Sequence, residues 1–347
     1  MKSGRLVSIL MFVVALSAAA FYFSEQEIKK VVDQEGGTTY LVGLMGKVNQ
    51  VAKVVVTDSN GKTHLLKQGD RWLVKEQSGY DAEFTKVKKL LLGLADLETI
   101  ESKTSKPENY GRLGVQAVGE AGEVASKQIQ LFDKADNLMH TLIVGKAKSL
   151  RTAGGPTSKG AIYVRQPNDE QSWLVSGKIE LPDTQTEWLN KSIIDLKASR
   201  VQAVNIQHAD KDTLSISKKA KADENYAVDN FPEKAELKSS SAANQIAALL
   251  QNLTFDEVLK RGGFEADDKK ITDITFDTFD GLKIMTKLIE KEGKHYIWFD
   301  AKAESDDDAI KQESSKLNTN FALWVYQISE TNANKFKKKL EDLIKTP

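Results

Sequence analysis

The chain has 347 residues, and 49 Lys and Arg balance 49 Asp and Glu to a formal net charge of zero. This balance gives no global field that would attract nucleic acid or an acidic substrate, and the length predicts two domains or one large sheet structure. The lack of Cys excludes disulfides, thiolate nucleophiles and zinc clusters built on sulfur.

The N-terminus combines a short basic start with a long apolar segment. Lys2 and Arg5 precede residues 6–23, which carry no charge and are long enough to cross a bilayer as a helix. We interpret residues 1–24 as an uncleaved transmembrane anchor that crosses the bilayer once. A cleaved signal peptide, with its cleavage site in the alanines before Phe21, is the alternative. The positive-inside rule then keeps the N-terminus in the cytoplasm and makes the rest of the chain extracytoplasmic.

A polar linker is expected over residues 25–47, and the folded region is expected to begin near Val48. Short β-branched runs punctuated by turn residues predict a meander of strands at 51–58, 63–67, 71–76, 127–133, 138–146, 161–166 and 172–176. Between the third and fourth of these strands, apolar residues from Val87 to Leu97 recur at helical spacing, with Asp81 as the expected N-cap. A short helical region is expected around residues 187–196.

The same pattern then recurs in the second part of the chain. Three β-branched positions repeat at an offset of about 150 residues, and a group of leucines and a Phe-Asp pair repeat at similar offsets: Val51, Val54 and Val56 with Val201, Val204 and Ile206; Leu90, Leu91 and Leu94 with Leu249, Leu250 and Leu253; Phe132-Asp133 with Phe276-Asp277. We therefore predict an α+β fold of two similar repeats, residues 48–190 and residues 191–347. Each repeat is expected to be an antiparallel meander sheet with a helix packed on one face, and one transmembrane helix precedes both.

The C-terminal stretch predicts a strand followed by a basic amphipathic helix. Residues 321–329 form the strand, and Asn332 is expected to cap a helix whose apolar stripe ends at Ile344. The lysines at 337–339 lie mostly off that stripe. A helix docked on the sheet with solvated lysines is favoured over one resting on a membrane surface, because the stripe is short and has no Trp.

One loop, Gly155-Pro-Thr-Ser-Lys-Gly160, resembles a phosphate-binding loop. Such a loop must open a helix, so that backbone N–H groups and the helix N-terminus face the anion. Here the alternating strand pattern AIYVRQ (161–166) follows, and Lys159 precedes the second glycine instead of following it. The loop is therefore predicted to connect two strands.

Three further groups of residues are weighed as sites and rejected. The four histidines, His64, His140, His208 and His295, show no local pair at ligand spacing. The acidic run 304–308 lacks the internal Gly of a calcium loop and is expected to be a solvated loop. The five Trp residues, at 72, 173, 188, 298 and 324, are expected to pack in the core or at sheet edges. The sequence therefore predicts no catalytic, cofactor-binding or metal-binding residue, and no enzyme.

Taken in order, several stretches resemble a bacterial family of domains of unknown function. They are DRWLVKE (70–76), YGRLGV (110–115), LIVGK (142–146), IYVR (162–165), EWLNKSIIDLKASRVQAV (187–204) and WVYQIS (324–329). The resemblance covers about residues 48–345, with Arg112 as one departure. It implies a membrane-anchored envelope protein, often associated with auxiliary components of gliding-motility-type ABC transporters. The family supplies no catalytic residues.

These observations give two main functional hypotheses, and an envelope hydrolase ranks below both because the sequence shows no motif for one. The first is a non-enzymatic, single-pass accessory protein, anchored through residues 6–23, whose outer domains bind a protein partner in a transport or envelope complex. The alternative is a membrane-tethered binding protein for a small molecule, peptide or glycan, with a pocket between its two halves. Neither hypothesis requires nucleic acid or a cofactor.

Overall fold

The computed structural model describes residues 37–149, 151–152, 155–156, 160–229, 231–233 and 235–345. The predicted anchor, residues 1–24, lies outside this range. The contacts divide the described chain into two compact units. Unit 1 comprises residues 37–69 and 85–181, and unit 2 comprises residues 70–84 and 182–345.

Unit 1 is built on an antiparallel sheet. Its sheet strands follow the order β2-β1-β6-β7-β10-β11-β5, and each pair of neighbours is antiparallel. In chain order its elements are η1 (Met45–Gln50), β1 (Lys53–Asp58), β2 (Gly61–Gln68), α2 (Phe84–Ala95), β5 (Glu98–Ser102), η3 (Pro107–Asn109), α3 (Tyr110–Leu113), β6 (Lys127–Phe132), β7 (Leu138–Lys148), β8 (Arg151–Thr152), β9 (Gly155–Pro156), β10 (Ala161–Arg165) and β11 (Ser172–Ser176).

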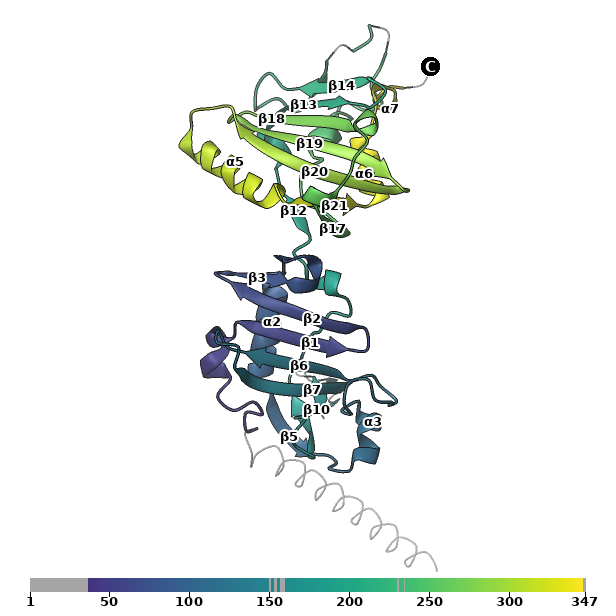
Figure 1. Ribbon diagram of the computed structural model, residues 1–347. Coiled ribbons are helices and arrows are strands. Elements are labelled where there is room, and N and C mark those ends of the chain that lie inside the picture. Colours follow the sequence, from purple (N-terminus) through teal and green to yellow (C-terminus); the bar gives the residue numbers. More distant parts are fainter. Residues whose placement is uncertain are drawn as a thin grey trace, which may run out of the picture. The chain divides into compact units, whose positions relative to one another are not determined.

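Alternation along the strands gives the sheet of unit 1 a core face and an outer face. Val54 and Val56 of β1 are buried and pair with Leu131 and Ile129 of β6, which are buried too. Helix α2 lies behind the strands in Figure 1 and buries one stripe. The stripe consists of Val87, Leu90, Leu91, Leu94 and Ala95.

Unit 2 is built on a second antiparallel sheet. The order is β15-β14-β13-β18-β19-β20-β21-β17. In chain order the elements of this unit are β3 (Arg71–Val74), η2 (Lys75–Gln77), β4 (Tyr80–Asp81), η4 (Gln185–Trp188), β12 (Ser192–Ile194), η5 (Ala198–Arg200), β13 (Val201–Gln207), β14 (Thr213–Ser217), β15 (Ala227–Val228), α4 (Asn244–Ala247), β16 (Leu253–Thr254), β17 (Glu257–Lys260), η6 (Arg261–Gly263), η7 (Asp268–Lys270), β18 (Thr272–Thr278), β19 (Leu282–Lys291), β20 (Lys294–Ala303), α5 (Asp308–Phe321), β21 (Trp324–Ile328), α6 (Glu330–Phe336) and α7 (Leu340–Leu343).

The two sheets share one strand order. When the two-residue strand β15 at the edge of the unit 2 sheet is left out, each sheet has seven strands. If these seven strands are ranked by their place in the chain, both sheets read second, first, fourth, fifth, sixth, seventh, third. The registers agree as well, because Val54 pairs with buried Leu131 and Val204 pairs with buried Phe276. Leu131 therefore occupies the position in unit 1 that corresponds to Phe276 in unit 2. The sequence pattern instead matches Phe132 to Phe276.

Each unit also begins with an extended segment that pairs with the strand after its helical region. In unit 1, Tyr40 N–H donates to Leu97 O at 2.7 Å and Thr99 N–H donates to Thr38 O at 3.0 Å. In unit 2, β12 pairs antiparallel with β16. Leu41, inside the predicted polar linker, is buried. The fold of unit 1 therefore starts before residue 48.

Several helix predictions are wrong in detail. Asp81, the expected N-cap of the first helix, lies in β4, and α2 begins at Phe84. The region around 187–196 contains the short η4 and the strand β12, and α4 ends at Ala247, before the leucines that were expected to extend it. The last helix is split into α6 and α7. Ser329, and not Asn332, caps α6, because its hydroxyl accepts from the Asn332 N–H.

The described part of the chain is mostly antiparallel sheet with few helices, which confirms the α+β class (Figure 1). No helix within it is long and apolar enough to cross a membrane.

Candidate functional site

The loop that resembles a phosphate-binding loop connects strands. Its first two residues form β9, which pairs antiparallel with β8, and residues 157–159 lie outside the described chain. After Gly160 the chain enters β10, which pairs with β7 and β11. The helix that a phosphate site requires is therefore replaced by a strand, as predicted.

The Trp residues are mostly buried, and the His residues are spread over separate elements. Four of the five Trp residues are buried: Trp72, Trp188, Trp298 and Trp324. The four histidines lie in β2, β7, the turn after β13, and β20. Among the described residues, no group of three or more His, Cys, Asp or Glu is placed to hold a metal ion.

The acidic run has a local structural role that the sequence analysis missed. The Asp307 side chain accepts from the Ala309 N–H at 2.8 Å and caps α5, and Asp308 lies in the first turn of that helix. Carboxylates at a helix N-terminus satisfy free N–H groups and interact favourably with the helix dipole. This N-cap pattern was the signal for α5.

The three consecutive lysines between α6 and α7 each contact a different part of unit 2. Lys337 donates to Glu290 at 2.7 Å and lies 3.3 Å from Nδ1 of buried His295. Lys338 donates to Gln245 in α4, and Lys339 binds two carboxylates in the turn between β13 and β14, Asp210 and Asp212. The lysines fasten the C-terminal segment to the unit, so the preferred docked interpretation holds, although the lysines are paired and not merely solvated.

One concavity in unit 2 lies at the turn between β18 and β19. It has a volume of about 570 Å³, within the range of small-molecule sites. Its lining is polar, with Asp277, Asp280, Lys283 and Glu304 as the charged residues. Gly281 closes the turn at φ +87°, where an added Cβ would lie 2.7 Å from the Ser305 Cβ.

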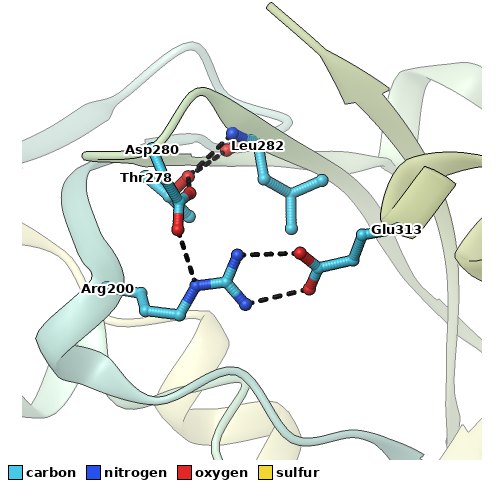
Figure 2. A network of polar contacts seen from close by, with 5 residues as sticks. All are labelled: Arg200, Thr278, Asp280, Leu282 and Glu313. Carbon is cyan, nitrogen blue, oxygen red and sulfur yellow. Dashed lines mark hydrogen bonds and ion pairs between the residues drawn. The ribbon is translucent and has the colours of Figure 1, made fainter. Parts of the chain in front are cut away.

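An arginine network supports the wall of this pocket (Figure 2). Arg200 donates Nε to Asp280 at 3.0 Å and both terminal nitrogens to Glu313 of α5, each at 2.9 Å. Hydrogen bonding to Glu313 raises the pKa of Arg200, so the guanidinium stays charged. Burial opposes ionisation of Asp280, but hydrogen bonds from Thr278 and Arg200 outweigh it and hold the pKa of this carboxyl below its ordinary value.

The other charged groups of the pocket are paired in the same way. Lys283 lies 3.1 Å from Asp277 and 2.8 Å from Glu304, and hydrogen bonding to Lys283 lowers the pKa of Glu304. The buried Ser305 hydroxyl has no hydrogen-bond partner within the described chain. The pocket can accommodate a small polar molecule, but its charged side chains already bind one another.

A second polar cluster lies in unit 1, where three stretches that carry the family resemblance meet. Arg165, at the end of IYVR, is 7% exposed and stacks over the Tyr110 ring of YGRLGV, with 4.4 Å between guanidinium carbon and ring centroid. Its Nε donates to Val115 O at 2.9 Å. A further terminal nitrogen donates to backbone carbonyls of the turn after β10, those of Gln166, Pro167 and Asp169.

Gly145 of LIVGK brings the third stretch into this cluster. A Cβ at this position would lie 2.3 Å from Leu113 O and 2.7 Å from Gly114 O, so only glycine allows the two backbones to approach. These stretches are recognisable in the sequence, but their contact with one another was not predicted. The available signal was a charged residue, Arg165, at the end of an otherwise apolar strand.

The family model for a domain of unknown function, DUF4340, matches residues 72–278. The match begins in β3 and ends with β18, and it is narrower than the region of about residues 48–345 over which the resemblance was seen. No curated protein and no solved structure matches the chain. Because the family model covers more than half of the 347 residues, the chain belongs to the DUF4340 family of domains of unknown function.

Proposed function

We propose that this protein is a non-enzymatic, single-pass membrane-anchored accessory protein, an auxiliary component of an ABC-type transport or envelope complex. The observation that carries the proposal is that the pocket's charged groups are paired with one another or with the arginine network behind the pocket wall. Arg200 is bound by Asp280 and Glu313, and Lys283 by Asp277 and Glu304. Ion pairs of this kind stabilise the shape of the pocket and leave none of these charged groups free to act as an acid, base or nucleophile.

The location is proposed from the sequence. Residues 6–23 carry no charge and follow Lys2 and Arg5, which favours an inner-membrane anchor with the N-terminus in the cytoplasm. The resemblance to membrane-anchored envelope proteins supports the same topology. A tether of this kind raises the effective concentration of the outer units near membrane partners, so weak contacts suffice for assembly.

The two units are proposed to be repeats of one ancestral α+β domain. Their shared strand order, the matching pairs Val54–Leu131 and Val204–Phe276, and the extended segment at the start of each unit support this proposal. A protein with two related units offers two related surfaces to a complex, and the differences between the units then decide which partner each surface binds.

The pocket of about 570 Å³ favours a second candidate, a tethered binding protein for a small polar ligand. The pocket lies within unit 2 and offers both signs of charge. A zwitterionic or hydroxylated molecule would compete with the internal ion pairs, so binding should disturb Lys283 and Glu304 first. Lys283→Gln would then abolish binding and leave the capture of protein partners unchanged.

Crosslinking in intact cells, followed by identification of the captured proteins, tests the first candidate. We expect transporter ATPase or permease subunits with the full chain, and loss of that capture when residues 1–24 are replaced by a cleavable export signal. A C-terminal reporter that is active only outside the cytoplasm tests the topology. A cytoplasmic C-terminus, or full complementation by the untethered chain, would overturn the proposal.

A further inference from the structure

Helix α2 presents a basic and partly apolar face to solvent. Its buried stripe faces the core, and the opposite face carries Lys88, Lys89 and Leu92, all exposed. Leu92 is 40% exposed, and Phe84, at the start of the helix and two turns before Leu92, is 55% exposed. The twelve residues of α2 include three lysines and no Asp or Glu.

The charge of the chain is divided unequally between the two units, although the total is zero. Residues 37–69 and 85–181 contain 18 Lys and Arg against 12 Asp and Glu. Residues 70–84 and 182–347 contain 27 Lys and Arg against 33 Asp and Glu. Unit 1 therefore carries a net positive charge and unit 2 an equal negative charge, so an anionic surface attracts the first and repels the second.

Two acidic residues lie beside this surface. Asp96 follows α2, is exposed one turn after Leu92, and sets one negative charge against the three lysines of the helix. Glu180 is paired with Lys178, and the hydrogen bond from that lysine, with a smaller contribution from Lys89, lowers the pKa of Glu180. Lys88 lies on the same face as Leu92, one turn before it. The face therefore combines local positive charge with exposed apolar side chains, the combination that binds the headgroup region of anionic bilayers.

We propose that the solvent face of α2 docks on a bilayer surface rich in anionic lipid headgroups. The inference rests on the proposed membrane anchor, because a single helix face of this size binds weakly unless a tether holds it near the bilayer. The lysines supply the attraction to lipid phosphate, and Leu92 and Phe84 enter the headgroup layer. Charge complementarity favours an anionic bilayer over a neutral one, because the lysines of this face are attracted to negatively charged headgroups.

The size of the effect follows from the lysines. Each Lys near an anionic membrane surface contributes about 1 kcal/mol, which corresponds to about a fivefold change in binding. Removing the charges of Lys88 and Lys89 should lower the ratio of docked to undocked molecules by about 25-fold. High salt should have a similar effect, because the attraction is screened over about 10 Å at 0.1 M ionic strength.

The experiment uses the absence of native Cys, which makes a single introduced Cys a unique labelling site. The full chain is reconstituted in phosphatidylcholine vesicles with and without phosphatidylglycerol, and a polarity-sensitive fluorophore is attached at Leu92→Cys. The matched control is Leu138→Cys, because Leu138 is also strongly exposed in unit 1 but lies in β7. We expect a blue shift and quenching by lipid-borne quenchers at position 92 with phosphatidylglycerol only, and no change at position 138.

Charge variants, read with the same label at position 92, test whether the lysines drive the docking. Lys88→Gln/Lys89→Gln should abolish the signal at position 92. The control Lys146→Gln/Lys148→Gln removes the same charge from exposed positions of β7 and should change the docked ratio by less than about threefold. Circular dichroism confirms that each variant is folded.

The outcomes separate this inference from the proposed function. If the full chain does not float with vesicles, the anchor and the proposed function fail. If the chain floats but position 92 stays water-exposed, or docks equally on neutral vesicles, the docking inference fails and the anchor stands. Equal loss of signal in the two double-lysine variants would also overturn it, because the effect would then reflect net charge and not the α2 face.

Discussion

Units 1 and 2 share a strand order but differ in how the outer face of each sheet holds one long connection. This connection comprises residues 103–126, between β5 and β6, in unit 1 and residues 261–271, between β17 and β18, in unit 2. In unit 1, Arg165 follows Val164, which pairs with Val144 of the preceding strand. In unit 2, Trp298 follows Ile297, which pairs with Leu288. Arg165 and Trp298 therefore occupy corresponding positions, and both point to the outer face.

The chemistry at these two positions is opposite. Arg165 holds backbone carbonyls and stacks on Tyr110, whereas Trp298 packs in an apolar cluster with Ile271, Ile289 and Val325 against Phe264. A cation ringed by carbonyls has strict geometric requirements, whereas an apolar cluster tolerates changes of similar volume. The same scaffold thus accepts two fastenings that should differ in their tolerance to substitution.

The strongest test of this contrast replaces Arg165 and Trp298, each by an apolar side chain that makes fewer specific contacts. Arg165→Met leaves the buried Val115 carbonyl and the turn carbonyls without a donor, and we expect a loss of about 3 kcal/mol in the free energy of unfolding. Trp298→Phe should cost about 1–2 kcal/mol. Urea denaturation gives the losses, and hydrogen exchange over residues 110–124 locates the first. Similar losses in both variants would contradict the contrast.

The close approach in unit 1 gives the second test. Gly145→Ala forces a Cβ against the Leu113 carbonyl, a backbone atom that cannot rotate away, and we expect a loss of about 2 kcal/mol. Gly262→Ala in unit 2 is the matched control, because a Cβ there meets nothing within 4 Å. The control should stay within about 0.5 kcal/mol of the parent protein in thermal melts. A neutral Gly145→Ala would mean that β7 can shift away from the cluster.

The third test concerns helix α5, which unit 2 inserts where unit 1 has a short turn between β10 and β11. Arg200→Lys keeps the charge but loses the two parallel bonds to Glu313, and we expect a loss of about 1–2 kcal/mol with faster amide exchange in α5. Lys311→Gln removes an exposed pair with Asp306 and should have no measurable effect. Unchanged exchange in α5 would show that its apolar contacts alone hold the helix.

The smallest effect is expected from pH. Burial, aided by Lys337, lowers the pKa of His295 below its ordinary value, so the unfolded chain takes up a proton before the folded unit does. The stability of unit 2 should therefore be full above pH of about 6.5 and fall as the pH drops toward the folded-state pKa. His295→Gln should flatten this dependence in urea titrations between these limits. An unchanged slope would assign the dependence to other groups.

Strand periodicity was the most reliable guide to the fold. The predicted strand at 172–176 coincides with β11, and the predicted strand at 127–133 contains β6. Both are short apolar runs bounded by turn residues, so local pattern and tertiary burial agree. Helix ends were less predictable, because α4 and α7 are single turns whose length depends on packing and not on local periodicity.

The polar clusters could not be predicted, because they depend on residues distant in sequence. Arg200 meets Glu313, 113 residues later in the chain, and Arg165 meets Val115, 50 residues earlier. Neither pair follows a spacing rule. The charge difference between the units can be counted from the sequence only when the unit boundaries are known. These boundaries are not a single cut, because residues 70–84 belong to unit 2 although they lie between the two segments of unit 1.

The extended segment at the start of unit 1 has a mechanical consequence. Tyr40 N–H donates to Leu97 O and Thr99 N–H donates to Thr38 O, and both hydrogen bonds run perpendicular to the two paired segments. A pull on the chain ahead of Thr38, along the segment, loads these bonds together in shear and does not unzip them one at a time. Unit 1 should therefore resist a pulling force applied at its N-terminal side, and the rate of forced unfolding measures that resistance.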